Sequence, residues 1–410
     1  MPPDNVKYAK LALGIGGTFL LIVAVPLGAQ NLYLMAATLF LIPLASYGVG
    51  RWLMTGPVCE RSMPPSCSEG SRLSVTLTVR NTGRFSTLPL RLQDRLPRSL
   101  RPVSREMPLL LGLRPGESAS VSYVLEPETR GLHVLGPTLL VGTDPLGFYS
   151  FRRRLSSVAE LLVYPTPLPL RRSFLRGASP AWMGESEAAA RGGGIDFQGV
   201  REFLPGDELR RVHWRTTART GRLAVTEYAQ ETALDILLAL DLSQTAYADT
   251  GVGTESALEY AIKIAATLLH ESETHGHAVH LLTPATVDAL NLREAGPVRM
   301  SRFLETLARA QADSPITLPA LLAQYLGPIG AVTLVYITPD ADNPELAAAL
   351  RAYEARGAQA FGFSLDASSF RSRRPGEERS NAPGAGGQGL RVCRGDDLTQ
   401  ILEGGAHGRF

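Results

Sequence analysis

The stretch Leu234-Asp-Ile-Leu-Leu-Ala-Leu-Asp-Leu-Ser-Gln-Thr245 joins a mostly apolar run to three oxygen-bearing side chains. Apolar runs of this length are typical of strands that are buried on both faces of a parallel sheet. Downstream, segments with helical periodicity alternate with further apolar runs. The expected helices are 256–270, 298–310, 318–325 and 344–356, and the expected strands are 278–282, 331–337 and 359–365. This alternation predicts an α/β domain over residues 232–367, with a parallel sheet covered by helices on both faces.

The three oxygen-bearing side chains at the end of the run are Asp241, Ser243 and Thr245. In an extended segment, residues i, i+2 and i+4 point to one side, so these side chains should converge just past the carboxyl end of the strand, where α/β sheets commonly bind ligands. Hard oxygen ligands suit Mg²⁺ or Mn²⁺, and two neutral hydroxyls leave the ion able to accept a carboxylate from a partner. The alternative is a metal-free domain in which Asp241 caps a helix or accepts hydrogen bonds from backbone amides.

An earlier part of the chain has a different periodicity. Arg72-Leu-Ser-Val-Thr-Leu-Thr-Val-Arg80 alternates polar and apolar residues without a break, which predicts a strand buried on one face. Further strand-like runs lie at 88–93, 118–125, 133–141, 148–154 and 161–164. Because Pro and Gly separate these short runs, we expect a β-sandwich-like domain over residues 72–170. Residues 51–71, which contain Pro57 and Pro64-Pro65-Ser66, are expected to be a linker.

Residues 11–50 contain no Asp, Glu, Lys, Arg or His. This stretch divides at Gln30-Asn31 into two apolar segments, each close to the length of about 20 residues that a helix needs to cross a bilayer. We therefore expect a transmembrane helical hairpin in contact with membrane lipid. Cations flank the hairpin on both sides, at Lys7, Lys10, Arg51 and Arg61, whereas the connecting turn carries no cation. The positive-inside rule then predicts a multi-pass protein of the cell membrane, with residues 1–10 and the soluble domains in the cytoplasm. A cleaved signal peptide is the alternative for the first segment.

Composition narrows the functional classes. The chain has 41 Lys and Arg against 39 Asp and Glu, so it lacks the basic excess that a nucleic-acid-binding protein usually has. The three cysteines, an odd number, suggest no disulfide framework. Near the C-terminus, the Gly-, Pro- and Ser-containing residues 368–389 are expected to be a flexible linker, and residues 390–410 a last strand, a short helix and a tail.

A hallmark segment, residues 171–231, lies between the two predicted domains. It contains Gly192-Gly-Gly-Ile-Asp-Phe-Gln-Gly-Val-Arg-Glu-Phe-Leu-Pro-Gly-Asp-Glu-Leu-Arg-Arg-Val-His-Trp-Arg-Thr-Thr-Ala-Arg219. This string resembles the hallmark of the domain-of-unknown-function family 58. Thr143-Asp-Pro-Leu-Gly-Phe148 is similar to a second segment of that family. The residues expected to form a structural network or a partner-docking surface are Arg201, Pro205, Gly206, Asp207, Arg210, His213, Trp214 and Arg215.

The resemblance implies an α+β multidomain protein: an N-terminal two-helix membrane hairpin, a β-sandwich-like domain and an α/β von Willebrand factor A-like (Rossmann-like) domain. It also implies that Asp241, Ser243 and Thr245 correspond to a metal-ion-dependent adhesion site, with Thr317 and Asp340 as the further ligands. Members of the family are often associated with MoxR-type AAA+ ATPases and have no established enzymatic activity.

Two functional hypotheses follow. The first is a membrane-anchored protein-interaction module that is not an enzyme and binds a partner, such as a MoxR-type AAA+ ATPase, through a divalent-ion face. The second is a metal-dependent hydrolase of unknown substrate that uses Asp241, Asp340 and a base such as His213. A hydrogen bond from His213 to a metal-bound water would favour the hydrolase.

Overall fold

The structure is a computed structural model. It describes residues 4–103, 109–110, 112–171, 174, 196–204, 207, 209–229, 235–251, 253–286, 297–325, 332–371 and 389–404. The chain forms two compact units, Met1–Thr166 and Pro167–Phe410.

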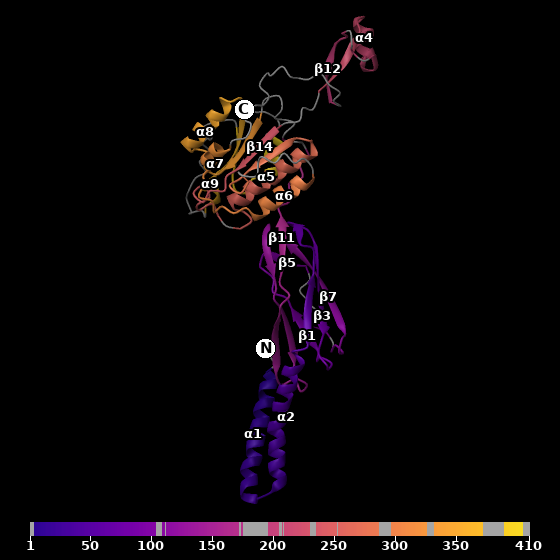
Figure 1. Cartoon of the computed structure of the whole chain (residues 1–410), viewed down its shortest axis with the longest axis vertical. Helices are drawn as coiled ribbons and strands as arrows, with labels where there is room; N and C mark the ends of the chain where they lie inside the picture. Colours follow the sequence, from indigo (N-terminus) through magenta and orange to yellow (C-terminus); the bar gives the residue numbers. More distant parts are fainter. Residues whose placement is uncertain are drawn as a thin grey trace. The chain divides into compact units, whose positions relative to one another are not determined.

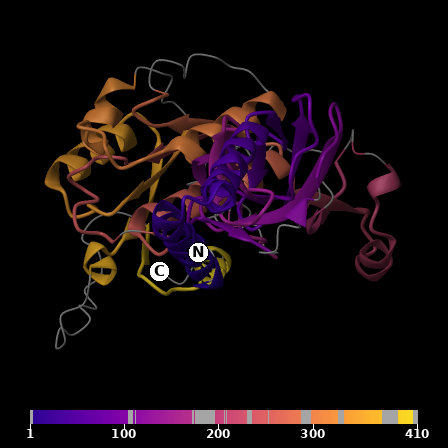
Figure 2. The same ribbon diagram turned by 90° about the horizontal axis from the view of Figure 1, so that it is seen from below.

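The first unit begins with two long apolar helices, α1 (Asp4–Leu27) and α2 (Gln30–Leu53). They lie side by side (Figures 1 and 2), and Gly17 allows this close approach because a Cβ atom there would lie 2.8 Å from the ring of Phe40. Both helices are long and apolar enough to cross a membrane. Most of their large apolar side chains, such as Ile22 and Leu34, are exposed, unlike those of a helix buried in a soluble core. The predicted pair of apolar helices is therefore confirmed.

Three sheets follow in the first unit. One has the strand order β1-β3-β7-β5, another β10-β9-β4-β6, and the third β2-β11-β8. The strands are β1 (Pro57–Ser62), β2 (Ser66–Ser68), β3 (Leu73–Asn81), β4 (Leu90–Gln93), β5 (Leu100–Pro102), β6 (Leu109–Leu110), β7 (Ser118–Pro127), β8 (Gly131–Leu135), β9 (Thr138–Thr143), β10 (Ser150–Leu155) and β11 (Ala159–Tyr164). Buried side chains from all three sheets, including Val75, Leu140 and Leu161, form one core. We call this part of the unit the β domain.

An ion pair between Arg61 and Asp94 lies inside the β domain. Their side chains are 2% and 0% exposed, and Arg61 Nη2 lies 2.7 Å from Asp94 Oδ1. The hydroxyl of Tyr123 donates to the other carboxylate oxygen of Asp94, and Thr138 Oγ1 donates to Oδ1 at 3.3 Å. Since these residues come from β1, β7, β9 and the end of β4, the network joins strands of two sheets.

Two features of the β domain differ from the sequence expectation. Residues 51–71 are not a linker throughout, because β1 and β2 lie there and β1 pairs with β3 from Pro57↔Asn81 to Ser62↔Thr76. Proline is tolerated at the first residue of an edge strand, and β1 is an edge strand. The single strand predicted over 133–141 is divided into β8 and β9 at the cis Gly136–Pro137 bond.

The second unit contains a five-stranded parallel sheet with the order β15-β14-β16-β17-β18. Its strands are β14 (Asp235–Leu240), β15 (Ala278–Leu282), β16 (Val332–Thr338), β17 (Gln359–Leu365) and β18 (Gly389–Val392). The helices are α5 (Ala257–Thr274), α6 (Pro297–Arg309), α7 (Leu318–Gln324), α8 (Pro344–Glu354), α9 (Ala367–Phe370) and α10 (Leu398–Gly404). The predicted alternation of helices and strands around a parallel sheet is confirmed.

Helices cover both faces of this sheet. Ile236, Leu238 and Leu240 of β14 pack with α5 and α6 in one core cluster. The intervening Leu237 and Ala239 pack with α7 and α8 in another. This alternation along a single strand explains why the run after Leu234 is apolar at nearly every position.

Candidate functional site

Asp241 follows the last residue of β14 and is buried. Its backbone N–H continues the ladder by donating to the carbonyl of Ile337 at 3.0 Å. Carboxylate atom Oδ1 accepts from the backbone N–H of Ser243 at 2.9 Å and from its hydroxyl at 2.7 Å. Atom Oδ2 accepts from the hydroxyl of Thr338, the last residue of β16, at 2.7 Å. The carboxylate thus links the carboxyl ends of two neighbouring strands.

The environment of Asp241 raises its pKa above the ordinary aspartate value. Burial is the largest cause, because it disfavours the charged form. The hydrogen bonds from Ser243 and Thr338 act in the opposite direction, while the negative charge of Asp340 adds to the increase. A cation at this place would therefore relieve an unfavourable buried charge.

The structure brings together only part of the predicted ligand set. Asp340 is exposed; its N–H donates to Thr338 Oγ1 at 3.0 Å, and its carboxylate accepts from Asn343 Nδ2 at 3.0 Å. Thr245 is exposed in a turn, and Thr317 precedes α7 as its N-cap residue. In the described ranges, the side-chain hydroxyls that donate to the Asp241 carboxylate belong to Ser243 and Thr338, not to Thr245 or Thr317.

The donor chemistry fits a hard divalent ion in part. Each of the two hydroxyls uses its proton on Asp241 and keeps oxygen lone pairs that could bind Mg²⁺ or Mn²⁺. Among the described residues there is no group of three or more His, Cys, Asp or Glu side chains that could hold a metal ion. An ion here would therefore depend on Asp241, Ser243, Thr338 and the nearby carboxylate of Asp340.

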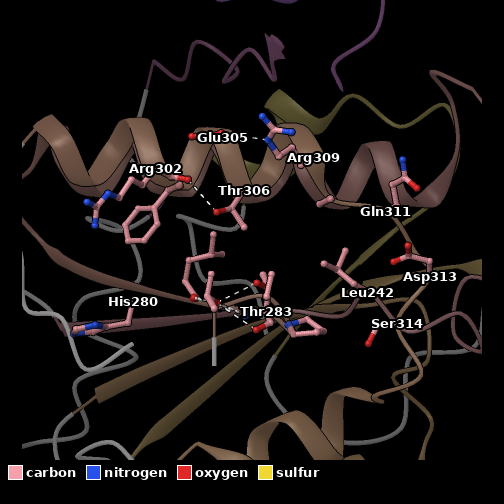
Figure 3. A pocket seen from close by; sticks show the side chains of 16 residues that line it. Leu242, His280, Thr283, Arg302, Glu305, Thr306, Arg309, Gln311, Asp313 and Ser314 are labelled. Atoms are coloured by element: carbon pink, nitrogen blue, oxygen red, sulfur yellow. Dashed lines mark hydrogen bonds and ion pairs between the residues drawn. The ribbon is translucent and has the colours of Figure 1, made fainter. Parts of the chain in front are cut away.

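A pocket of about 530 Å³ adjoins this site. Figure 3 shows α6 along one side, carrying Arg302, Thr306 and Arg309, with Leu242 and Thr283 on the other side, where β14 and β15 end. Ser314 also lines the pocket. It pairs with the loop after Asp241, since Gln244 N–H donates to its carbonyl at 2.9 Å and its own N–H donates to the Leu242 carbonyl at 3.1 Å. The pocket therefore reaches the loop that contains Ser243.

The hallmark segment forms a small hairpin with a short helix. Strands β12 (Asp196–Glu202) and β13 (Ala224–Ala229) pair in antiparallel fashion, and η1 (Leu209–Arg211) and α4 (Trp214–Thr220) lie between them. Arg201 makes two hydrogen bonds of 2.7 Å to the two carboxylate oxygens of Asp207. One of these oxygens also accepts from the Leu204 N–H at 2.8 Å. These two hallmark residues therefore fix the local fold.

Other hallmark residues have different surroundings. His213 caps α4, because its Nδ1 accepts from the backbone N–H of Thr216 at 3.2 Å. This contact gives the hydrolase hypothesis no support. Trp214 is 68% exposed and Leu209 is 67% exposed. The neighbouring Arg210 and Arg215 are also exposed. The predicted residues Pro205 and Gly206 lie outside the described ranges.

Sequence reasoning missed Thr338 and Ser314 as neighbours of the Asp241 site. Thr338 could have been found from its place at the end of the next strand of the sheet, because the parallel register Leu240↔Ile337 sets it beside Asp241. No comparable signal marks Ser314, whose contact with Ser243 is an isolated bridge outside the named strands.

The second unit therefore contains a parallel α/β sheet with a buried carboxylate at the end of a central strand. A hairpin with an exposed tryptophan precedes this sheet in the sequence. Residues 199–356 match the sequence profile of the family described as "Protein of unknown function DUF58". The match runs from β12 to the end of α8 and so includes Asp241. Over 334 residues the chain is 23% identical to the uncharacterized protein YeaD of Bacillus subtilis (strain 168), an alignment that covers 78% of this chain and 75% of that protein.

Solved structures align weakly. The CARDB domain of the PF1109 protein from Pyrococcus furiosus is 12% identical, with 26% of this chain and 86% of that chain covered and a TM-score of 0.19. A cohesin module of a family 33 glycoside hydrolase from Clostridium perfringens is 16% identical, with 27% and 98% covered and a TM-score of 0.18. Scores of this size do not establish a shared fold.

Proposed function

We propose that this chain is a membrane-anchored protein-interaction module and not an enzyme. The observation that carries the proposal is the hallmark hairpin, which leaves Trp214 and Leu209 about two-thirds exposed. Exposed tryptophan accompanied by arginine is the composition of binding hot spots rather than of ordinary protein surface. The Arg201–Asp207 ion pair supports this proposal, because it stabilises the hairpin while Trp214 remains accessible.

The second unit supplies a further surface in this proposal. It is a von Willebrand factor A-like domain whose Asp241, Ser243 and Thr338 bind Mg²⁺ or Mn²⁺ together with Asp340. The support is the convergence of hydroxyl and carboxylate oxygens at the ends of β14 and β16, with a pocket beside them. A carboxylate from the partner then completes the coordination of the ion.

The membrane part of the proposal is a two-span hairpin that holds the soluble domains on the cytoplasmic side. Its support is the length and apolar surface of α1 and α2, with lysines preceding the first span and Arg51 ending the second. The proposed partner is a MoxR-type AAA+ ATPase. This choice is supported by the resemblance of the hallmark segment to the domain-of-unknown-function family 58, whose members are often associated with such ATPases.

The test is a binding measurement with the full chain in detergent. The immobilised chain is presented with the MoxR-type ATPase of the same cell, with and without Mg²⁺ and ATP. Removal of a hot-spot side chain costs about 2 kcal/mol or more, roughly a 30-fold loss of affinity. We expect that loss for Trp214→Ala and no change for Leu132→Ala, which removes an exposed leucine of β8 in the β domain. Equal affinities for the two variants would contradict the hallmark as the docking surface.

A further inference from the structure

The loop between β9 and β10, residues 144–149, packs against the end of the second apolar helix. Ser46 of α2 donates a hydrogen bond to the Asp144 carboxylate, and both residues are buried. Gly50 lies under the same loop: a Cβ atom there would be 2.6 Å from the Phe151 ring and 2.9 Å from Asp144 Cβ. The loop and the start of β10 therefore pack against the last two turns of the helix, and at Gly50 there is no room for a side chain between them.

These contacts lie at the depth where a spanning helix leaves the hydrocarbon. With a rise of about 1.5 Å per residue, Ser46 is about 24 Å and Gly50 about 30 Å along the helix from Gln30. Gln30 and Asn31 are the polar residues at the opposite end, and the hydrocarbon core of a bilayer is about 30 Å thick. The loop that reaches Ser46 and Gly50 is therefore level with the boundary between hydrocarbon and headgroups.

The side chains around these contacts suit that boundary. The Tyr47 ring lies against the Tyr149 ring, with centroids 5.1 Å apart, and Lys10 Nζ lies 4.0 Å from the centre of the Tyr149 ring. Trp52, at the end of α2, contacts Phe85 of the β domain with centroids 4.8 Å apart, and both are 54% exposed. Tyrosine, tryptophan and cationic side chains are enriched at membrane interfaces.

Hydrogen bonds within the loop stabilise it, and its tip is apolar. The Asp144 carboxylate accepts from the Tyr149 N–H at 2.5 Å, and the Asp144 carbonyl accepts from the Gly147 N–H at 3.0 Å. Leu146, between these bonds, is 50% exposed. Cations are exposed nearby on α2 at Arg51 and beside Phe85 at Arg84.

We infer that the β domain is itself a lipid-binding domain: the tip of the β9–β10 loop and Phe85 insert into the headgroup layer of the phospholipid leaflet that α2 leaves. This inference rests on the membrane anchoring in the proposed function. The loop and the helix end form one rigid interfacial element, so the β domain is held against the leaflet rather than tethered by a flexible connection.

The test uses spin labels on the full chain, reconstituted in nanodiscs of phosphatidylcholine and phosphatidylglycerol. With Cys59, Cys67 and Cys393 replaced by alanine, a single cysteine is placed at Leu146, at Leu41 within α2, or at Arg72 before β3. Arg72 is the matched control, because it precedes the first residue of β3, whereas the last residue, Asn81, pairs with Pro57 close to the end of α2. Collision with oxygen reports lipid, and collision with a soluble nickel complex reports water.

We expect the ratio of oxygen to nickel accessibility to be highest at Leu41, intermediate at Leu146 and several-fold lower at Arg72. Equal ratios at Leu146 and Arg72, with Leu41 in lipid, would show that the loop does not lie at the membrane interface, while leaving the membrane anchor intact. Water-like ratios at all three positions would overturn the anchor and the inference together. A spin label at Phe85 provides a second test, because its ratio of oxygen to nickel accessibility should be close to that at Leu146.

Discussion

Replacing Asp241 by alanine should both weaken the parallel sheet and remove any divalent-ion site. The carboxylate accepts three hydrogen bonds, two from Ser243 and one from Thr338. At about 1 kcal/mol net for each bond, their loss costs about 3 kcal/mol. Burial of the charge is itself unfavourable, since it raises the pKa of Asp241. The variant recovers part of that penalty, so we expect a net loss of about 2 to 3 kcal/mol.

Amide hydrogen exchange of the detergent-solubilised full chain measures this loss where it occurs. A loss of about 2 to 3 kcal/mol corresponds to exchange roughly 30- to 150-fold faster in β14 and β16. Asp340→Ala is the matched control, because Asp340 is exposed and its carboxylate accepts from Asn343 rather than from the two strands. For that variant we expect a change within about 0.5 kcal/mol. Unchanged exchange in β16 of Asp241→Ala would refute the carboxylate as the link between the strands.

The same two variants separate the structural role from metal binding. Calorimetric titration with Mg²⁺ and Mn²⁺ should give no binding for Asp241→Ala, because the main negative charge of the site is gone. It should give weakened binding for Asp340→Ala, whose stability is nearly unchanged. Identical titrations for the wild type and both variants would show that these oxygens do not form a metal site.

Three further outcomes are expected. Arg61→Met should destabilise the β domain by about 3 to 5 kcal/mol, because it leaves the Asp94 carboxylate buried without its cation; thermal unfolding by circular dichroism measures this, and a shift no larger than that of a surface variant would contradict it. Burial acts to raise the pKa of Asp366, but hydrogen bonds from Ser368 and the charge of Arg391 outweigh it and lower the pKa. Asp366 therefore contributes stability that is present above the ordinary pKa of 3.8 and lost as the pH falls through the lower folded value, and Asp366→Asn should reduce this acid sensitivity in a pH series of urea unfolding. Protease added to intact spheroplasts should leave the domains after the hairpin uncut, and their digestion would contradict a cytoplasmic location.

The sequence predicts those helices and strands whose burial produces a regular pattern of apolar and polar residues. The unbroken alternation at 72–80 corresponds to β3, which is buried on one face, and the strands expected at 278–282 and 359–365 are β15 and β17 with the same bounds. The hairpin of β12 and β13 was not predicted. Its register shifts between Phe197 and Gly199, so an irregularity interrupts the period-two pattern. The helix α4 is seven residues long, too short for a clear helical period.

The candidate site was predicted in part for a related reason. Spacing i, i+2, i+4 places side chains together only while the backbone stays extended, and the chain turns after Ser243, so Thr245 is exposed in the turn. The second hydroxyl that donates to Asp241 instead belongs to Thr338, 97 residues further along, at the end of the adjacent strand. Parallel strands bring such residues together through register, which no local spacing contains. A ligand that attracted the hydroxyl oxygen of Thr338 would act on the hydrogen bond that links Asp241, just after β14, to the end of β16. Any binding at this site would therefore be coupled to the relative position of the two central strands.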